Sequence, residues 1–148
     1  MAQKRLQRHN CRLIPLILWK IHLLYQWTPE IDYFTSNEQR AKNGLKALAA
    51  NWELSRVARY KSQDMVDNRY FSHTSPTYGT PFQMIKAFGL TYRTAGENIA
   101  YGQRTPQAVV SAWMDSSGHR ANILNASYTQ IGVGYVSSGH YWTQMFIG

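Results

Sequence analysis

Two β-rich runs near the end of the chain constrain its fold more than any other feature. Residues 131–136 and 141–147 are rich in β-branched and aromatic side chains, and the short stretch Ser137-Ser138-Gly139-His140 separates them. A link of this kind between two such runs predicts a hairpin. The helix signals come before the hairpin, so their order favours an α+β layered domain over a doubly wound α/β domain.

Helix signals recur through the middle of the chain. The spacing of apolar side chains predicts a helix over residues 53–68. Thr80-Pro81 and Thr105-Pro106 each combine a capping hydroxyl with a proline suited to the first helical turn, which predicts two more helices. The expected buried stripe of the helix at Thr80-Pro81 consists of Phe82, Ile85 and Phe88.

The first 36 residues differ in pattern from the rest of the chain. A basic stretch from Lys4 to Arg12 precedes an apolar run over 13–19, in the order of a secretory signal. The run has no small-x-small cleavage site after it, and a membrane span needs about 20 apolar residues. We therefore expect residues 1–36 to form an atypical N-terminal segment, a weak signal or anchor or a part foreign to the domain. Residues 37–148 are expected to form the domain.

Cysteine content and charge limit the classes of site and partner. The one cysteine, Cys11, excludes an intramolecular disulfide and a four-cysteine zinc site. The formal net charge of +8 favours anionic partners such as wall polymers, acidic lipid surfaces or nucleic acid. Nucleic acid is the least expected of these, because the sequence has no helix-turn-helix, basic recognition helix or ribonucleoprotein motif.

Glu97 is the most conspicuous candidate for chemistry. It stands in an otherwise uncharged β-like segment, Gly96 to Tyr101, where a buried carboxylate is costly unless it is paired. His73 and His119 lie in expected loops and are its obvious partners. Two histidines and one glutamate could bind a divalent metal such as Zn²⁺ and leave positions open for water. Their spacing matches no compact ligand motif, so the histidines could instead satisfy buried backbone groups and hold the loops in place.

A serine nucleophile is a weaker alternative. Ser116 and Ser117 lie close to His119, and Asp115 is adjacent, but triads are assembled in space rather than in sequence. The chain also lacks a G-x-S-x-G elbow. Ser116 or Ser117 is therefore expected to cap a short helix over 118–124.

The many aromatic side chains have two readings. They could form a stacking surface for sugars or bases, although we expect most of them to pack in the core and between layers. The set comprises Trp52, Tyr60, Tyr70, Phe71, Tyr92, Tyr101, Trp113, Tyr128, Tyr135, Tyr141, Trp142 and Phe146.

Gly96-Glu97-Asn98-Ile99-Ala100 resembles the G-E-N-I/L-A strand of the CAP superfamily, which contains cysteine-rich secretory proteins, antigen 5 and plant pathogenesis-related proteins. The resemblance runs from residue 37 to residue 147. Further segments follow in the order of the bacterial, cysteine-free SCP-like branch: Asn37-Glu38-Gln39-Arg40, Tyr70-Phe71-Ser72-His73, Ala112-Trp113-Met114, residues 118–124, Ile131-Gly132-Val133-Gly134 and Tyr141-Trp142-Thr143-Gln144.

The resemblance implies a three-layer α-β-α sandwich with a central antiparallel sheet and a central cleft. In animal members the cleft carries two histidines and two glutamates. By motif position three of these four correspond to His73, Glu97 and His119, and Ser116 and Asn98 are expected to be supporting residues. The second glutamate falls on Ser116, which weakens the case for a complete metal site. His73 and His119 would be the ligands of any bound zinc.

The family further implies export to the cell envelope or the extracellular space. The leading expectation is a cleft that binds an extracellular or envelope ligand: a glycan, a lipid or a protein. One alternative is a divalent-metal-dependent hydrolase or protease that uses the same residues. The other is a structural His-Glu-His network that binds no ligand. No membrane span is expected.

Overall fold

The structure is a computed structural model, and it describes residues 29–148. The expected signal or anchor, with its apolar run over 13–19, lies outside the described residues. The elements run in the order α2 (Pro29–Lys42), β1 (Ala49–Ala50), α3 (Trp52–Asp67), α4 (Pro81–Ala87), β2 (Ala95–Tyr101), α5 (Pro106–Met114), α6 (Ser117–Ile123), β3 (Gln130–Val136) and β4 (Tyr141–Ile147).

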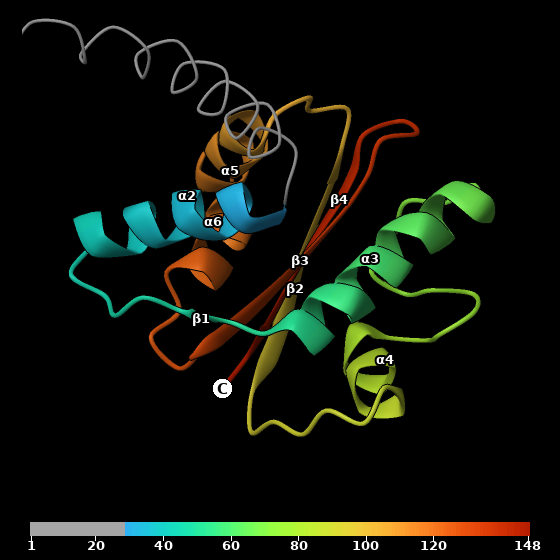
Figure 1. The fold of residues 1–148 in the computed structure, drawn as a ribbon, viewed down its shortest axis with the longest axis horizontal. Helices are drawn as coiled ribbons and strands as arrows, with labels where there is room; N and C mark the ends of the chain where they lie inside the picture. The colour runs from blue at the N-terminus through green and yellow to red at the C-terminus, as the bar shows by residue number, and fades with distance from the viewer. Residues whose placement is uncertain (1–28) are drawn as a thin grey trace, which may run out of the picture.

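The elements form three layers, as expected (Figure 1). Helices α2, α5 and α6 cover one face of the sheet, and α3 and α4 cover the other. The strand order is β1-β3-β4-β2. The predicted hairpin is therefore β3–β4, and its second strand, β4, lies inside the sheet between β3 and β2. The three long strands are antiparallel as expected, whereas β1 pairs with β3 in parallel. A strand of two alanines is too short to show a period, which is why the sequence did not indicate this mixed pairing.

The two faces of β4 build two separate cores. Trp142 and Phe146 point to the side of α5 and pack in a cluster that includes Trp113. Met145 and Ile147 belong to the cluster on the side of α3 and α4. This alternation follows from the period of two in a strand covered on both faces.

The predicted helix starts are largely confirmed. Thr80 accepts a hydrogen bond from the Gln83 backbone N–H at 3.2 Å, and Thr105 accepts one from Ala108 at 3.1 Å. Two expectations differ from the structure, the one about Phe82 of α4 in full and the one about the cap of α6 in part. Phe82 is exposed, because a helix as short as α4 turns only Pro81, Met84 and Ile85 inward. Ser116 does occupy the N-cap position of α6, but its side chain makes no capping hydrogen bond.

Helix α2 begins at Pro29, so the expected boundary after residue 36 falls inside it. Asp32 and Ser36 are buried, and both accept a hydrogen bond from the Gln144 side-chain amide of β4, at 2.5 and 2.7 Å. Polar residues ahead of Asn37 therefore pack through hydrogen bonds with the sheet rather than through apolar contact.

Candidate functional site

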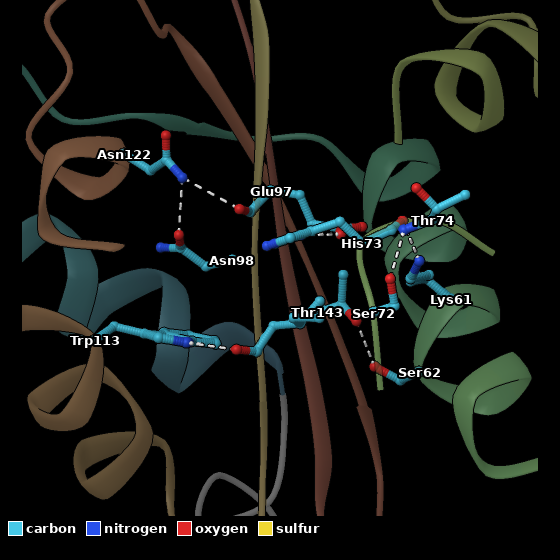
Figure 2. A network of polar contacts seen from close by, with 11 residues as sticks. Lys61, Ser62, Ser72, His73, Thr74, Glu97, Asn98, Trp113, Asn122 and Thr143 are labelled. Atoms are coloured by element: carbon cyan, nitrogen blue, oxygen red, sulfur yellow. Dashed lines mark hydrogen bonds and ion pairs between the residues drawn. The ribbon is translucent and has the colours of Figure 1, made fainter. Parts of the chain in front are cut away.

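The centre of the site is a pair formed by His73 and Glu97 (Figure 2). His73 lies in the loop that follows α3, and Glu97 lies in β2 on the face that α3 covers. The His73 Nδ1 and Glu97 Oε1 atoms are 2.8 Å apart. The imidazole is 54% exposed, whereas the carboxylate side chain is 1% exposed. We call these two residues the His73–Glu97 pair.

One oxygen of the Glu97 carboxylate is left without a partner. Glu97 Oε2 is buried and accepts no hydrogen bond from any residue in the described range 29–148. Burial raises the pKa of Glu97, while the hydrogen bond with His73 and the charge of Lys61 lower it, and the net pKa lies above its ordinary value. An unsatisfied buried acceptor of this kind is costly, so it marks a position where a donor would bind favourably.

Lys61 holds the His73 loop against α3. Its side chain is buried, and its ammonium donates to the His73 carbonyl at 2.5 Å. The ammonium also lies 5.4 Å from the centre of the Tyr70 ring. Burial lowers the pKa of Lys61, and the charges of Glu97 and Asp64 offset only part of that effect. Sequence reasoning missed this residue, although a lysine in the apolar stripe of α3 was a signal for it.

Asp64 fixes the remainder of the same loop. Its carboxylate accepts hydrogen bonds from Ser75 and Thr77 at 2.6 Å, from Asn68 at 2.7 Å and from the Tyr70 hydroxyl. Burial raises the pKa of Asp64, but these four hydrogen bonds outweigh it and the net pKa lies below the ordinary value. The loop that carries His73 is therefore held from both sides by one side chain of α3.

Replacing Asp64 by asparagine is expected to lower the free energy of unfolding by about 3 kcal/mol, because an amide nitrogen cannot accept the donors that Asp64 binds. Urea unfolding followed by circular dichroism measures the effect. Asp67→Asn is the matched control, since Asp67 is exposed and accepts one side-chain hydrogen bond, from Gln63. An equal loss in both variants would contradict the role assigned to Asp64.

His119 is linked to the His73–Glu97 pair by hydrogen bonds that involve its backbone carbonyl and the side chains of Asn98 and Asn122. The Asn98 amide donates to the His119 carbonyl at 3.2 Å, and the Asn122 amide donates to Asn98 Oδ1 at 2.9 Å and to the Glu97 carbonyl at 3.1 Å. Burial lowers the pKa of His119, and the charge of His73 lowers it further. The neutral imidazole is therefore the favoured form of His119 at neutral pH.

The residues of the site do not form a metal centre with three protein ligands. In the part of the chain that the structure describes, no three His, Cys, Asp or Glu side chains gather closely enough to hold a metal ion. Nδ1 of His73 is engaged by Glu97, and the resemblance noted in the sequence places Ser116 where a second glutamate is expected. Zinc binding stays a prediction, and we assign no chemical step to it.

A pocket of about 470 Å³ lies beside the His73–Glu97 pair rather than on it. Tyr70 and Phe71 come from the same loop as His73, and Tyr101 ends the strand that carries Glu97. The full lining consists of Val66, Arg69, Tyr70, Phe71, Tyr101, Ser138, Gly139 and Tyr141.

Comparison with known proteins decides the family. The family model described as CAP, cysteine-rich secretory protein family, matches residues 34–146. The chain belongs to the CAP family. This CAP domain is 63% identical over 113 residues to the uncharacterized protein YkwD of Bacillus subtilis, a match that spans 76% of this chain.

Two solved structures are similar to this CAP domain. One is an extracellular protein with an SCP domain from Bacillus anthracis, with a TM-score of 0.73 and 39% identity over 76% of this chain. The other is an outer surface protein from Borrelia burgdorferi, with a TM-score of 0.73 and 26% identity, covering 80% of this chain and 90% of that one. The chain spans 44% of the length of YkwD and 37% of the Bacillus anthracis chain.

Proposed function

We propose that this CAP domain is an exported ligand-binding module whose recognition centre is the His73–Glu97 pair. One observation carries the proposal: a buried carboxylate has an unpartnered oxygen next to a half-exposed imidazole. Glu97 Oε2 is itself buried, so a ligand meets the pair at the half-exposed His73 imidazole, which Glu97 orients.

The pair is held ready for a ligand by its surroundings. Lys61 and Asp64 fix the loop of His73, and Asn122 binds the backbone of Glu97. Because His73 uses Nδ1 for Glu97, its Nε2 is the ring atom left for a ligand. Preorganised polar groups of this kind lower the entropic cost of binding.

The place of action is proposed from the relatives and from the charge. The Bacillus anthracis relative is described as extracellular and the Borrelia burgdorferi relative as an outer surface protein. The net charge of +8 favours anionic envelope polymers as the source of the ligand. Within residues 29–148, no helix is long and apolar enough to cross a membrane.

Glu97→Gln is expected to weaken ligand binding at least tenfold, because the amide removes one acceptor and the carboxylate charge. The probes are soluble muropeptides and phosphatidylglycerol vesicles, and binding is measured by chemical shift changes or by calorimetry. Glu53→Gln is the matched control, since Glu53 is exposed and pairs only with Arg56.

Two results would count against this function. The first is wild-type protein that shows no saturable binding to either probe. The second is a Glu97→Gln variant that binds as tightly as the Glu53→Gln control. A lowered stability of Glu97→Gln together with the first result would favour the structural network instead.

A further inference from the structure

Three aromatic rings gather at the end of the sheet where the β3–β4 hairpin turns. The Phe71 and Tyr101 ring centres are 4.8 Å apart with the rings edge to face, and Tyr101 stacks on Tyr141 at 5.6 Å. Phe71 is 46% exposed and Tyr101 is 56% exposed. Phe71 and Tyr101 are exceptions to the expectation that most of the aromatic residues pack in the core and between layers. We call Phe71, Tyr101 and Tyr141 the aromatic platform.

The aromatic platform lines the pocket described above, and Arg69 adds the only formally charged side chain among the lining residues. Arg69 is exposed, and no carboxylate among the described residues forms an ion pair with it. Its backbone has a φ of +53°, and its neighbours Asn68 and Tyr70 both donate to Asp64. The guanidinium is thus attached to a backbone that is held in place at the rim of an aromatic pocket.

The pocket and the His73–Glu97 pair lie on one face of the sheet. Residues 97, 99 and 101 of β2 share a face because side chains alternate along a strand. Tyr101 pairs with Tyr141, and Ile99 pairs with Thr143, whose hydroxyl is 2.8 Å from that of Ser62 in α3 (Figure 2). Three residues of strand lie between Glu97 and Tyr101, and the four steps from one to the other span roughly 13 Å. An extended ligand of two or three rings could therefore contact both places.

We propose that this pocket is a saccharide subsite that binds an acidic sugar. A pyranose ring stacks on the aromatic platform, and its carboxylate or phosphate group pairs with Arg69. Exposed tyrosines offer large rigid contact areas together with hydroxyl groups, and arginine matches the fork geometry of a carboxylate or phosphate. The pocket is an open hollow of about 470 Å³ rather than an enclosed cavity, so one ring of an extended saccharide can lie in it while the rest continues outside.

The observations favour a sugar over a lipid tail or a nucleic acid. A tail needs an enclosed apolar tunnel, whereas this pocket has arginine, serine and tyrosine hydroxyl groups in its wall. A nucleic-acid backbone needs a basic groove, whereas Arg69 is the only cationic side chain in this lining. The subsite rests on the proposed function and extends it, because it names acidic saccharides as the ligand class of the binding module that contains the His73–Glu97 pair.

The subsite is tested by calorimetric titration with three saccharides. Two are acidic, namely trigalacturonate and the disaccharide of N-acetylglucosamine and N-acetylmuramic acid. The third, maltotriose, is neutral. Wild-type protein is expected to bind at least one acidic saccharide saturably and more tightly than maltotriose. Tyr101→Ala and Phe71→Ala should each weaken that binding at least tenfold, or about 1.4 kcal/mol. Arg69→Gln should remove the preference for acidic over neutral saccharide.

The controls are Phe82→Ala, an aromatic that is 48% exposed on α4, and Arg93→Gln, an exposed arginine outside the pocket lining. No saturable binding of either acidic saccharide, or equal losses in the controls, would overturn the subsite. If Glu97→Gln abolishes muropeptide binding while the Phe71, Tyr101 and Arg69 variants bind normally, the subsite is wrong and the proposed function stands. If the Phe71, Tyr101 and Arg69 variants lose binding while Glu97→Gln binds normally, the subsite is supported and the His73–Glu97 pair is not the recognition centre of the module.

Discussion

Asp32→Asn is expected to change the free energy of unfolding by about 4 kcal/mol more favourably at pH 8 than at pH 4. Burial raises the pKa of Asp32 from 3.8 to about 7, against smaller lowering effects of the hydrogen bonds from Gln144 and Ser36. Oδ1 of Asp32 accepts hydrogen bonds from Gln144 and Ser36, and the asparagine Oδ1 can accept the same two, while its amide nitrogen adds one buried donor more than the protonated acid has. The variant therefore removes the pH-dependent cost of the buried charge and adds a pH-independent cost for the extra donor.

The direction of the pH dependence follows from the raised pKa. Between about pH 4 and pH 7 the folded protein keeps the Asp32 proton while the unfolded chain has lost it. The contribution of protonated Asp32 to the free energy of unfolding is therefore fully present below about pH 4. It falls as the pH rises to about 7 and is absent above that. Glu97 also has a raised pKa and adds an effect of the same sign, so the difference between wild type and variant isolates Asp32.

Urea unfolding at pH 4, 6 and 8 measures this difference. Asp115→Asn serves as the control, because Asp115 is exposed at the C-cap of α5. If the Asp32→Asn and wild-type stability curves run parallel across this pH range, the buried carboxylate does not titrate as we infer.

Gly134→Ala is expected to lower the free energy of unfolding by at least about 3 kcal/mol, at the upper end of the usual cost of overpacking. A Cβ atom at this position would lie 2.1 Å from the Arg59 backbone nitrogen and 2.2 Å from the Ala58 backbone carbon. Because both neighbours are backbone atoms of α3, no side-chain rotation relieves the clash. The helix would have to move away from the sheet and open the core that includes Leu54 and Met145.

Gly118→Ala is the matched control for this substitution. Gly118 lies in α6, and a Cβ there meets no atom within 4 Å. Alanine also stabilises a helix interior relative to glycine by roughly 0.5–1 kcal/mol. The two variants should therefore shift the urea midpoint in opposite directions. A Gly134→Ala protein as stable as wild type would show that α3 does not rest on β3 as closely as the structure has it.

Local signals in the sequence predicted much of the secondary structure correctly. Thr80 and Thr105 begin helices because a hydroxyl acceptor followed by proline satisfies the first turn whatever surrounds it. The link over 137–140 joins two antiparallel strands because those strands carry strong β-formers on each side. The prediction that Phe82 is buried was wrong, because burial depends on how a short helix is oriented against the sheet, and no local pattern encodes that orientation.

The candidate site was predictable in part. The cost of burying Glu97 singled it out, and the structure places His73 against it. Lys61, Asp64 and Asn122 were missed, since each acts through a loop or strand distant in sequence. The parallel pairing of β1 was missed because β1 has only two residues and because its partner β3 lies about 80 residues later.

By itself, the sequence determined where most helices and strands lie, that one buried strand carries a carboxylate, and that the chain resembles a known family. Those features depend on neighbours along the chain, namely caps, turn residues and periodicity. Only the tertiary structure decided which donors reach Glu97, that one of its oxygens has no partner among the described residues, and that Phe71, Tyr101 and Tyr141 form one pocket with Arg69. These arrangements depend on packing between distant segments, where a shift of one ångström makes or breaks a hydrogen bond.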